Sequence, residues 1–311
     1  MYYIFVNPAS KSGSGQALWN EAEAMFKERG ISYEVYLTEK DKSIRDRYEE
    51  IYNKTEERPV KLIILGGDGT LNQVVQGITH PEDTELSLIR NGSGNDFSRN
   101  KNLPVDLNEI IDGIINRKHE MDIDIGESVY SEGCLPDGSP IPDGSHRYLV
   151  SSGLGYDADI CYYANHSPLL KKLLKHQVYT FFGVKNIFTT GLADMEININ
   201  GQISIYPHVY FLAAMNQPYE GGGVPMSPDA SDTDGMLDFL VIYGLSRLGA
   251  LFLVPKLKTK KHLGSKGVAL LKGQKARITC SLPKMVHYDG ETPGLYKTFE
   301  TSIIGKIRFV Y

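Results

Sequence analysis

The sequence predicts an α/β protein of two domains: an N-terminal doubly wound α/β nucleotide-binding domain and a C-terminal antiparallel β-sandwich domain. First, short apolar runs rich in β-branched residues alternate with amphipathic stretches up to about residue 122. Second, the strands of this part end in glycine-rich or polar segments. Third, short alternating runs dominate the rest of the chain. A length of 311 residues suits about two domains, and we expect each to have its own sheet.

In the first part, alternation of strands and helices implies a parallel sheet with helices on both faces. Ligands of such sheets bind beyond the carboxyl ends of the strands. The polar segments 7–15, 66–70 and 91–96 all follow strands, so we expect them to gather at one edge. The expected strands are Tyr2–Val6, Tyr33–Leu37, Val60–Leu65 and Leu86–Ile89, and the expected helices are Ala17–Arg29 and Ile44–Asn53.

The second part starts with Gly126–His146, which we interpret as a turn-rich insertion. Two helices are expected among its strands, at Pro168–Thr189 and Ser246–Lys261. Leu169, Leu170, Leu173 and Leu174 of the first helix favour core packing with a basic, solvated opposite face. The expected strands are Tyr148–Ser151, Met195–Ile199, Ile203–Tyr206, Val209–Ala213, Leu237–Ile242, Ala276–Cys280 and Lys306–Val310.

Composition excludes several classes of protein. Hydrophobic residues make up 41% and charged residues 23%, which is typical of a globular protein. The net charge of −5 gives no basic field, so we expect no nucleic-acid partner. The N-terminus lacks the pattern of a signal peptide, and no apolar run approaches the ~20 residues that span a bilayer. We therefore expect a cytoplasmic protein without a transmembrane segment.

Cysteine and histidine spacing predicts no metal site. The three cysteines are far apart and odd in number, which favours neither a disulfide framework nor a zinc site. No two of the eight histidines are four residues apart.

Gly66-Gly67-Asp68-Gly69-Thr70, directly behind the strand Val60–Leu65, is the most informative segment. A strand, a glycine turn and a helix together aim backbone N–H groups and a positive helix end at one point, where a phosphate can bind. Glycine lets the backbone approach the phosphate closely. Asp68 would repel phosphate unless a cation lies between them, so it suggests magnesium. The alternative is a plain βα turn capped by Asp68 and Thr70.

Four segments, in this order, carry a family resemblance: Gly66–Thr70, Asn95–Arg99, Asp234–Asp238 and Asp289–Glu291. In order and spacing they resemble the diacylglycerol kinase catalytic family, which includes soluble bacterial lipid kinases and the sphingosine and ceramide kinases. The resemblance covers essentially the whole chain. The motif GGDGT alone is shared with NAD kinases and is similar to the phosphofructokinase loop.

The resemblance implies that residues 1–122 form an ATP-binding domain like that of NAD kinase and phosphofructokinase. Residues 123–311 would form a β-rich domain for a lipid substrate, with the last strand able to return toward the first domain. The implied reaction transfers the γ-phosphate of Mg-ATP to the hydroxyl of a neutral lipid, foremost diacylglycerol, which gives phosphatidic acid. The lipid would be presented at the membrane surface, with the protein peripheral to its inner face; a homodimer is compatible with this.

Residue roles follow from the same resemblance. Asp289 is the expected general base, which must reach the acceptor hydroxyl. Glu291 faces the same side of an extended segment, and Asp68 is the third expected catalytic residue. Asp68, Asp96 and Asp234 are expected to hold Mg²⁺ through an Asp–water–magnesium network. The expected ATP-binding residues are Asn7, Ser10, Thr38, Gly66, Gly67, Gly69, Thr70, Asn72, Gly92, Ser93, Gly94, Asn95 and Arg99.

Simpler interpretations of two of these aspartates remain open. Asp96 would be a turn residue that pairs with Arg99, and Asp234-Gly235 an ordinary hairpin turn. The second loop also departs from the family pattern, since Arg90 and Asn91 stand where a proline and a variable residue commonly precede Gly-Thr-Gly-Asn-Asp. Ser93 keeps a hydroxyl that can bond a phosphate; the departure bears on nucleotide affinity.

Two other functions compete with a lipid kinase. One is an NAD-kinase-type kinase of a soluble substrate, and the other is a catalytically impaired nucleotide-binding regulator. The cluster Lys256, Lys258, Lys260, Lys261 and Lys266 is either a solvated helix end or a docking patch for anionic lipid headgroups.

Overall fold

The structure, a computed structural model, describes residues 1–38, 43–174 and 177–311. It divides into two compact units. The first contains Met1–Ile125, Gly221–Gly223 and Ile304–Tyr311, and the second contains Gly126–Glu220 and Val224–Ile303. None of the described helices is both long and apolar enough to cross a membrane.

The first unit is built on a parallel sheet in the order β14-β4-β3-β1-β2. Its central strands are buried almost throughout, as both-face coverage requires. The strands are β1 (Tyr2–Val6), β2 (Tyr33–Leu37), β3 (Val60–Gly66), β4 (Thr84–Arg90) and the end of β14 (Glu291–Val310).

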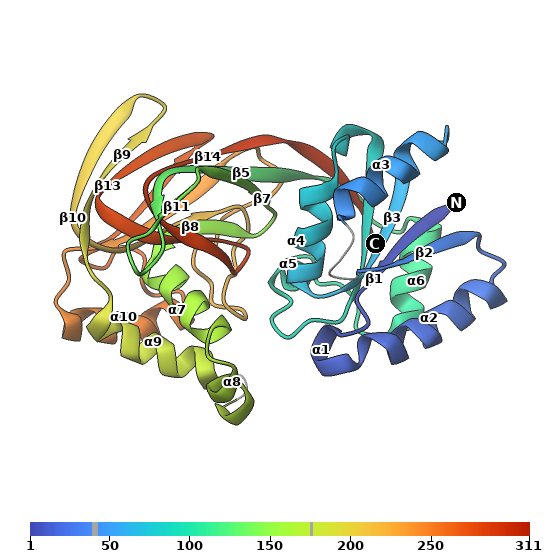
Figure 1. The fold of residues 1–311 in the computed structure, drawn as a ribbon, viewed down its shortest axis with the longest axis horizontal. Helices are drawn as coiled ribbons and strands as arrows, with labels where there is room; N and C mark the ends of the chain where they lie inside the picture. The colour runs from blue at the N-terminus through green and yellow to red at the C-terminus, as the bar shows by residue number, and fades with distance from the viewer. Residues whose placement is uncertain (39–42, 175–176) are drawn as a thin grey trace. The chain divides into compact units, whose positions relative to one another are not determined.

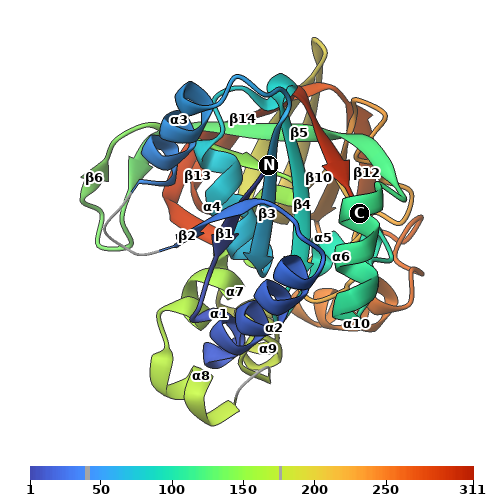
Figure 2. The ribbon, with the colours of Figure 1, turned by 90° about the vertical axis from the view of Figure 1, so that its right-hand side faces the viewer.

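Helices cover both faces of this sheet, which confirms the doubly wound prediction (Figure 2). On one face, α2 (Gly15–Glu28) and α6 (Leu107–Asn116) pack Trp19, Phe26 and Ile111 against Ile4 and Ile63. On the other face, α3 (Ile44–Lys54) and α4 (Asp68–Gly77) pack together. Short helices α1 (Ser10–Gly13), η1 (Pro81–Asp83) and α5 (Asp96–Asn100) complete the unit.

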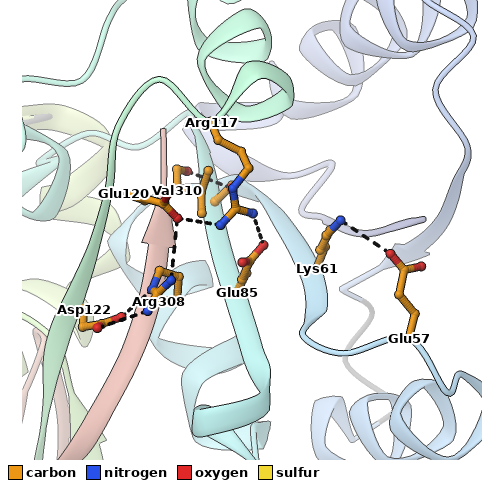
Figure 3. Close-up of polar contacts among 9 residues, drawn as sticks. Glu57, Lys61, Glu85, Arg117, Glu120, Asp122, Arg308 and Val310 are labelled. Carbon is orange, nitrogen blue, oxygen red and sulfur yellow. Dashed lines mark hydrogen bonds and ion pairs between the residues drawn. The ribbon is translucent and has the colours of Figure 1, made fainter.

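Ion pairs fasten the last strand of the first unit (Figure 3). Arg308 of β14 pairs with Asp122, and Arg117 bridges Glu85 of β4 and Glu120. In the ladder, Arg308 lies beside Glu85. These contacts hold residues 304–311 in the first unit, although they are the last of the chain.

The second unit is an antiparallel sandwich, as predicted (Figure 1). The long strands β10 and β13 each pair with β9 at one end and with β8 at the other end. Both long strands therefore pass from one layer of the sandwich to the other. Its core includes Leu212, Phe239, Ile278 and Val286. The strands are β5 (Glu120–Cys134), β6 (Pro140–Ile141), β7 (Gly144–Tyr148), β8 (Ser151–Gly155), β9 (Ala193–Ile199), β10 (Gln202–Met215), β11 (Leu237–Tyr243), β12 (Val268–Gly273), β13 (Lys275–Tyr288) and most of β14.

Several sequence-based expectations for this part are wrong. Gly126–His146 is not a turn-rich insertion, because β5 runs to Cys134 and pairs with β6 and β7. The expected strands Ile203–Tyr206 and Val209–Ala213 are one strand, β10, with an irregularity where its partner changes. The expectation of separate sheets also fails: β5 and β14 continue from one unit into the other.

The expected helix Pro168–Thr189 corresponds to α8 (Pro168–Leu174) and α9 (Gln177–Thr189), with residues 175–176 outside the described residues. Leu170 and Leu174 pack against the α9 core as expected, but Leu169 and Leu173 are 83% and 77% exposed. The core-packing interpretation therefore holds for Leu170 and Leu174 and is wrong for Leu169 and Leu173. The other helices are α7 (Tyr156–Asn165) and α10 (Arg247–Lys258), which begins after the capping residue Ser246.

Candidate functional site

The glycine turn behind β3 touches the loop behind β4. β3 ends at Gly66, and α4 begins at Asp68. A Cβ on Gly67 would lie 2.7 Å from the α-carbon of Gly92, a distance that no side chain tolerates. The N–H of Asn91 donates to the carbonyl of Gly66 at 2.6 Å, so the two loops are joined along their backbones. Residues 66–70 and 91–96 do gather at one sheet edge.

Asn95 shapes the second loop. Its backbone is left-handed, with φ +54°, directly before α5. Its Oδ1 accepts from the Gly92 N–H at 3.0 Å, and its Nδ2 donates to the Gly92 carbonyl at 2.8 Å. Asparagine tolerates this conformation better than most residues. The loop that results leaves Ser93 exposed, with its hydroxyl making no hydrogen bond to any residue that the structure describes.

The segment behind β1 joins these two loops. Asn7 donates from Nδ2 to Thr70 Oγ1 at 2.9 Å, and Asn91 donates to Ser10 Oγ at 2.7 Å. Thr38, behind β2, donates from both its N–H and its hydroxyl to the carbonyl of Val6. Polar groups from four consecutive strand ends are thus linked.

Asp68 and Asp96 are brought together as the sequence predicts. Asp68 Oδ2 accepts the backbone N–H of Asp96 at 3.0 Å. A Cβ on Gly94 would lie 3.5 Å from Asp68 Oδ2 and 3.7 Å from Asp96 Oδ2, so both carboxylates flank that residue. The arrangement is typical of a cation site, because two neighbouring carboxylates repel unless a positive charge lies between them.

Asp96 is buried, with 8% of its surface exposed. Burial raises the pKa of its carboxyl, against backbone hydrogen bonds from Gly222 and Gly223 and the charge of Arg99. The Gly222 N–H donates to Oδ2 at 2.9 Å, whereas the Arg99 guanidinium is 4.0 Å from Oδ1. Oδ1 accepts no hydrogen bond within the described residues. A buried carboxylate oxygen that accepts no hydrogen bond, beside a second carboxylate, fits a divalent cation.

Asp234 has a different environment. It lies in the second unit, where Oδ1 accepts the N–H of Met236 and Oδ2 pairs with Lys272 at 2.9 Å. Lys272 lies on β12 opposite Asp238, so the sequence near Asp234 did not reveal this partner. Of the three expected metal ligands, the structure brings Asp68 and Asp96 into contact and gives Asp234 a lysine counter-ion.

Asp289 lies in the hairpin between β13 and β14 with φ +44°. Its carboxylate accepts three backbone N–H bonds of 3.0–3.1 Å, from Leu149, Val150 and Ser151. These bonds fix its orientation and tie the hairpin to the start of β8. Glu291 is exposed, and its carboxylate makes no hydrogen bond or ion pair within the described residues. The two acids therefore differ: one is anchored and the other is free to contact a ligand.

Two further expected ATP-binding residues, Asn72 and Arg99, have different surroundings. Asn72 is buried in α4, and its Oδ1 accepts a hydrogen bond from Gln76. Arg99 is half-exposed and lies against Gly223, because a Cβ there would come within 2.8 Å of its guanidinium carbon. The side chain of Arg90, where the loop departs from the family pattern, makes no hydrogen bond or ion pair within the described part of the chain.

Comparison with known proteins gives one family model for each part of the chain. The family described as diacylglycerol kinase catalytic domain matches residues 1–128. The family described as YegS C-terminal NAD kinase beta sandwich-like domain matches residues 149–303.

Two curated relatives are similar over nearly the whole chain. "Putative lipid kinase YtlR" of Bacillus subtilis is 24% identical over 298 residues, 94% of each chain. A diacylglycerol kinase of Staphylococcus aureus is 28% identical over 295 residues, which are 94% of this chain and 86% of that one.

Solved structures share the fold. One from Bacillus anthracis, described as "a putative diacylglycerol kinase", has a TM-score of 0.73 at 18% identity, covering 100% of this chain and 96% of the other. An NAD kinase from Archaeoglobus fulgidus in complex with ATP has a TM-score of 0.53 at 10% identity, covering 100% and 94%.

Proposed function

This chain belongs to the diacylglycerol kinase catalytic family of lipid kinases, and we propose that it transfers the γ-phosphate of Mg-ATP to the hydroxyl of diacylglycerol, giving phosphatidic acid. The observation that carries the proposal is the contact of Gly67 with Gly92 beside the carboxylates of Asp68 and Asp96. Phosphoryl transfer needs phosphate donors, a metal-holding acid and a group that accepts the hydroxyl proton.

The joined loops supply the phosphate site. Backbone N–H groups at the start of α4, together with the exposed hydroxyl of Ser93, are suited to bind phosphate oxygens. The absence of side chains at Gly67 and Gly92 lets the two loops meet. Arg90 and Arg99 would add positive charge near the same loops, since they border residues 91–96 in the sequence.

Asp68 and Asp96 would hold Mg²⁺, which would neutralise charge on the transferred phosphoryl group. Asp96 offers Oδ1, while its Oδ2 stays bonded to Gly222. Asp234 remains a candidate third ligand, and its participation requires that it exchange Lys272 for the metal or a bound water.

We propose Asp289 as the group that accepts the proton of the lipid hydroxyl, with Glu291 orienting the acceptor. The N–H bonds from Leu149–Ser151 hold the Asp289 carboxylate in one direction, which is what positioned general-base catalysis requires. The free carboxylate of Glu291 is the competing choice for the same role.

An exposed apolar surface on α8, α9 and α10 supports a lipid substrate. Leu169 and Leu173 of α8 and Leu248 and Phe252 of α10 are each at least 62% exposed. Exposed apolar clusters of this kind suit an interfacial helix with lysines beside it, here Lys256 and Lys258 in the last turn of α10. Helix α9 contributes Tyr179, Phe181, Val184 and Phe188. We propose that this surface contacts the membrane that presents the lipid.

The test is transfer of radiolabelled phosphate from ATP to a panel of lipids in mixed micelles, with NAD as a soluble acceptor. We expect labelled phosphatidic acid from diacylglycerol, dependence on Mg²⁺, and no labelled NADP. Labelling of NAD instead of any lipid would favour the NAD-kinase-type alternative, with which the chain shares its fold. ATP binding without transfer to any acceptor would favour a nucleotide-binding regulator.

A further inference from the structure

A buried cluster of ionisable side chains in the second unit has no part in the proposed reaction. It consists of Asp157 at the start of α7, Glu220 in the segment after β10, and His287 of β13. The side chains are 6%, 12% and 0% exposed. His287 Nε2 lies 3.2 Å from Asp157 Oδ2 and 3.5 Å from Glu220 Oε1. One nitrogen therefore faces two carboxylates inside the protein.

Without a metal, His287 and Asp157 form a hydrogen bond of 3.2 Å, and the same distances also suit a shared cation. A charged N–H···O bond is usually about 2.7–2.9 Å long, and a single N–H points well at one acceptor only. Nitrogen and oxygen ligands lie about 2.0–2.2 Å from Zn²⁺, so tetrahedral geometry separates neighbouring ligands by about 3.3–3.5 Å. The separation of 3.5 Å matches such an edge, and the separation of 3.2 Å is slightly shorter than one.

Charge balance points the same way. Two carboxylates with a protonated histidine carry a net charge of −1, whereas the same carboxylates with a neutral histidine and a divalent cation are neutral. Buried uncompensated charge is costly. The cluster therefore attracts positive charge strongly.

The kinds of ligand in the cluster favour zinc over magnesium. Imidazole nitrogen suits Zn²⁺, whereas Mg²⁺ is bound by carboxylate, carbonyl and water oxygens. The imidazole of His287 therefore makes zinc the better fit.

We propose that Asp157, Glu220 and His287 bind a divalent transition-metal ion, best Zn²⁺, at a structural site separate from the Mg-ATP site. The ion would join α7, β13 and the segment after β10. It would also fix Glu220, the residue before Gly221–Gly223. Sequence spacing missed the site because its three ligands come from distant segments and no two lie in a familiar motif.

The test uses the full-length protein without nucleotide or lipid. Bound metal is removed with a chelator, the chelator is dialysed away, and Zn²⁺ binding is measured by calorimetry and by metal content. We expect one Zn²⁺ per chain, a higher melting temperature on binding, and no displacement by millimolar Mg²⁺. His287→Gln and Glu220→Gln should each weaken Zn²⁺ binding at least about a hundredfold. Changes to residues that only support the ligands of a metal typically cost about 10–100-fold in affinity, so the loss of a ligand should cost at least the upper value.

His262→Gln is the matched control, because His262 is equally buried and bonds a backbone carbonyl, that of Met226. It should bind Zn²⁺ like the wild type. A melting curve recorded with chelator present shows which variants fold without metal. If His287→Gln or Glu220→Gln does not fold, Asp157→Asn is tested in its place. Absence of stoichiometric Zn²⁺ binding in the wild type would overturn the proposal, as would unchanged affinity in the folded ligand variants. Neither result bears on lipid kinase activity, which is measured separately.

Discussion

The backbones of Gly67 and Gly92 lie in direct contact: a Cβ on either residue would come within 2.7 Å of the α-carbon of the other. The two glycines follow different strands, so their contact joins the turn behind β3 to the loop behind β4. Since both loops also carry the acids Asp68 and Asp96, this contact sets the geometry of the proposed Mg-ATP site.

Gly67→Ala should therefore separate the loops. We expect the affinity for Mg-ATP to fall at least about tenfold, which corresponds to 1.4 kcal/mol, within the usual ~1–3 kcal/mol cost of overpacking. Calorimetric titration with Mg-ATP measures this. Gly305→Ala is the control, because Gly305 belongs to the same unit and a Cβ there meets nothing within 4 Å. Equal ATP affinity in both variants would contradict a role for the contact.

Asp68→Ala should abolish phosphoryl transfer while the fold survives, because the metal loses a ligand and the backbone N–H of Asp96 loses its acceptor, the Asp68 carboxylate. Asp96→Asn should raise the Mg²⁺ concentration required for half-maximal activity at least about tenfold, since a neutral amide binds hard cations more weakly. Circular dichroism and Mg²⁺ titrations of activity measure these effects. Normal Mg-ATP affinity and turnover in Asp68→Ala would contradict the assignment of Asp68 as a metal ligand.

Asp234→Asn distinguishes two roles for the third acid. A metal ligand predicts the same shift in Mg²⁺ requirement as Asp96→Asn. A partner of Lys272 alone predicts an unchanged Mg²⁺ requirement. In that case Lys272→Met, which removes the counter-ion, should affect stability rather than Mg²⁺ dependence.

The sequence predicted most of the first unit because its signals are local. Each expected strand there is a parallel strand, buried almost throughout except for β2, and the expected bounds of β1 and β2 match those of the structure. Helix α6 was nevertheless missed. Asp106 caps it by accepting the N–H of Glu109, and Leu107, Ile110 and Ile111 follow at helical spacing, so a signal was present.

The second unit was harder to predict because its strands depend on distant partners. Gly126 and Gly144 resemble turn residues, yet each makes room for a tyrosine ring, of Tyr148 and Tyr130 respectively. Similarly, nothing near Asp289 in the sequence indicates that its carboxylate binds the N–H groups of Leu149–Ser151. Contacts between distant segments are what one sequence does not reveal.

The apolar surface of α10 gives a prediction for membrane binding. The double variant Leu248→Ser, Phe252→Ser should bind vesicles of anionic phospholipid at least about tenfold more weakly, because burying each apolar side chain contributes ~1.5–3 kcal/mol when complete. Vesicle sedimentation measures this. Ile205→Ser is the control, since Ile205 is 72% exposed but lies on β10. Equal loss in the control would show that the effect is not specific to the helices.

The last prediction separates Asp289 from Glu291. Asp289→Asn replaces one acceptor oxygen by an amide group, so at least one of the three backbone N–H bonds is lost, at a cost of ~1–3 kcal/mol. We therefore expect a lower melting temperature. If Asp289 is the general base, kcat on an accepted lipid should also fall about 10²–10⁴-fold, with Mg-ATP affinity nearly unchanged.

Glu291→Gln is the matched comparison, because its exposed carboxylate makes no hydrogen bond or ion pair within the described residues, so its melting temperature should not change. Its kcat should fall less than that of Asp289→Asn if Glu291 only orients the acceptor. A folded Asp289→Asn variant that retains more than about a tenth of wild-type kcat is outside the range of general-base catalysis. Asp289 would then be an anchor of the hairpin, and a large loss in Glu291→Gln would transfer the role of base to Glu291.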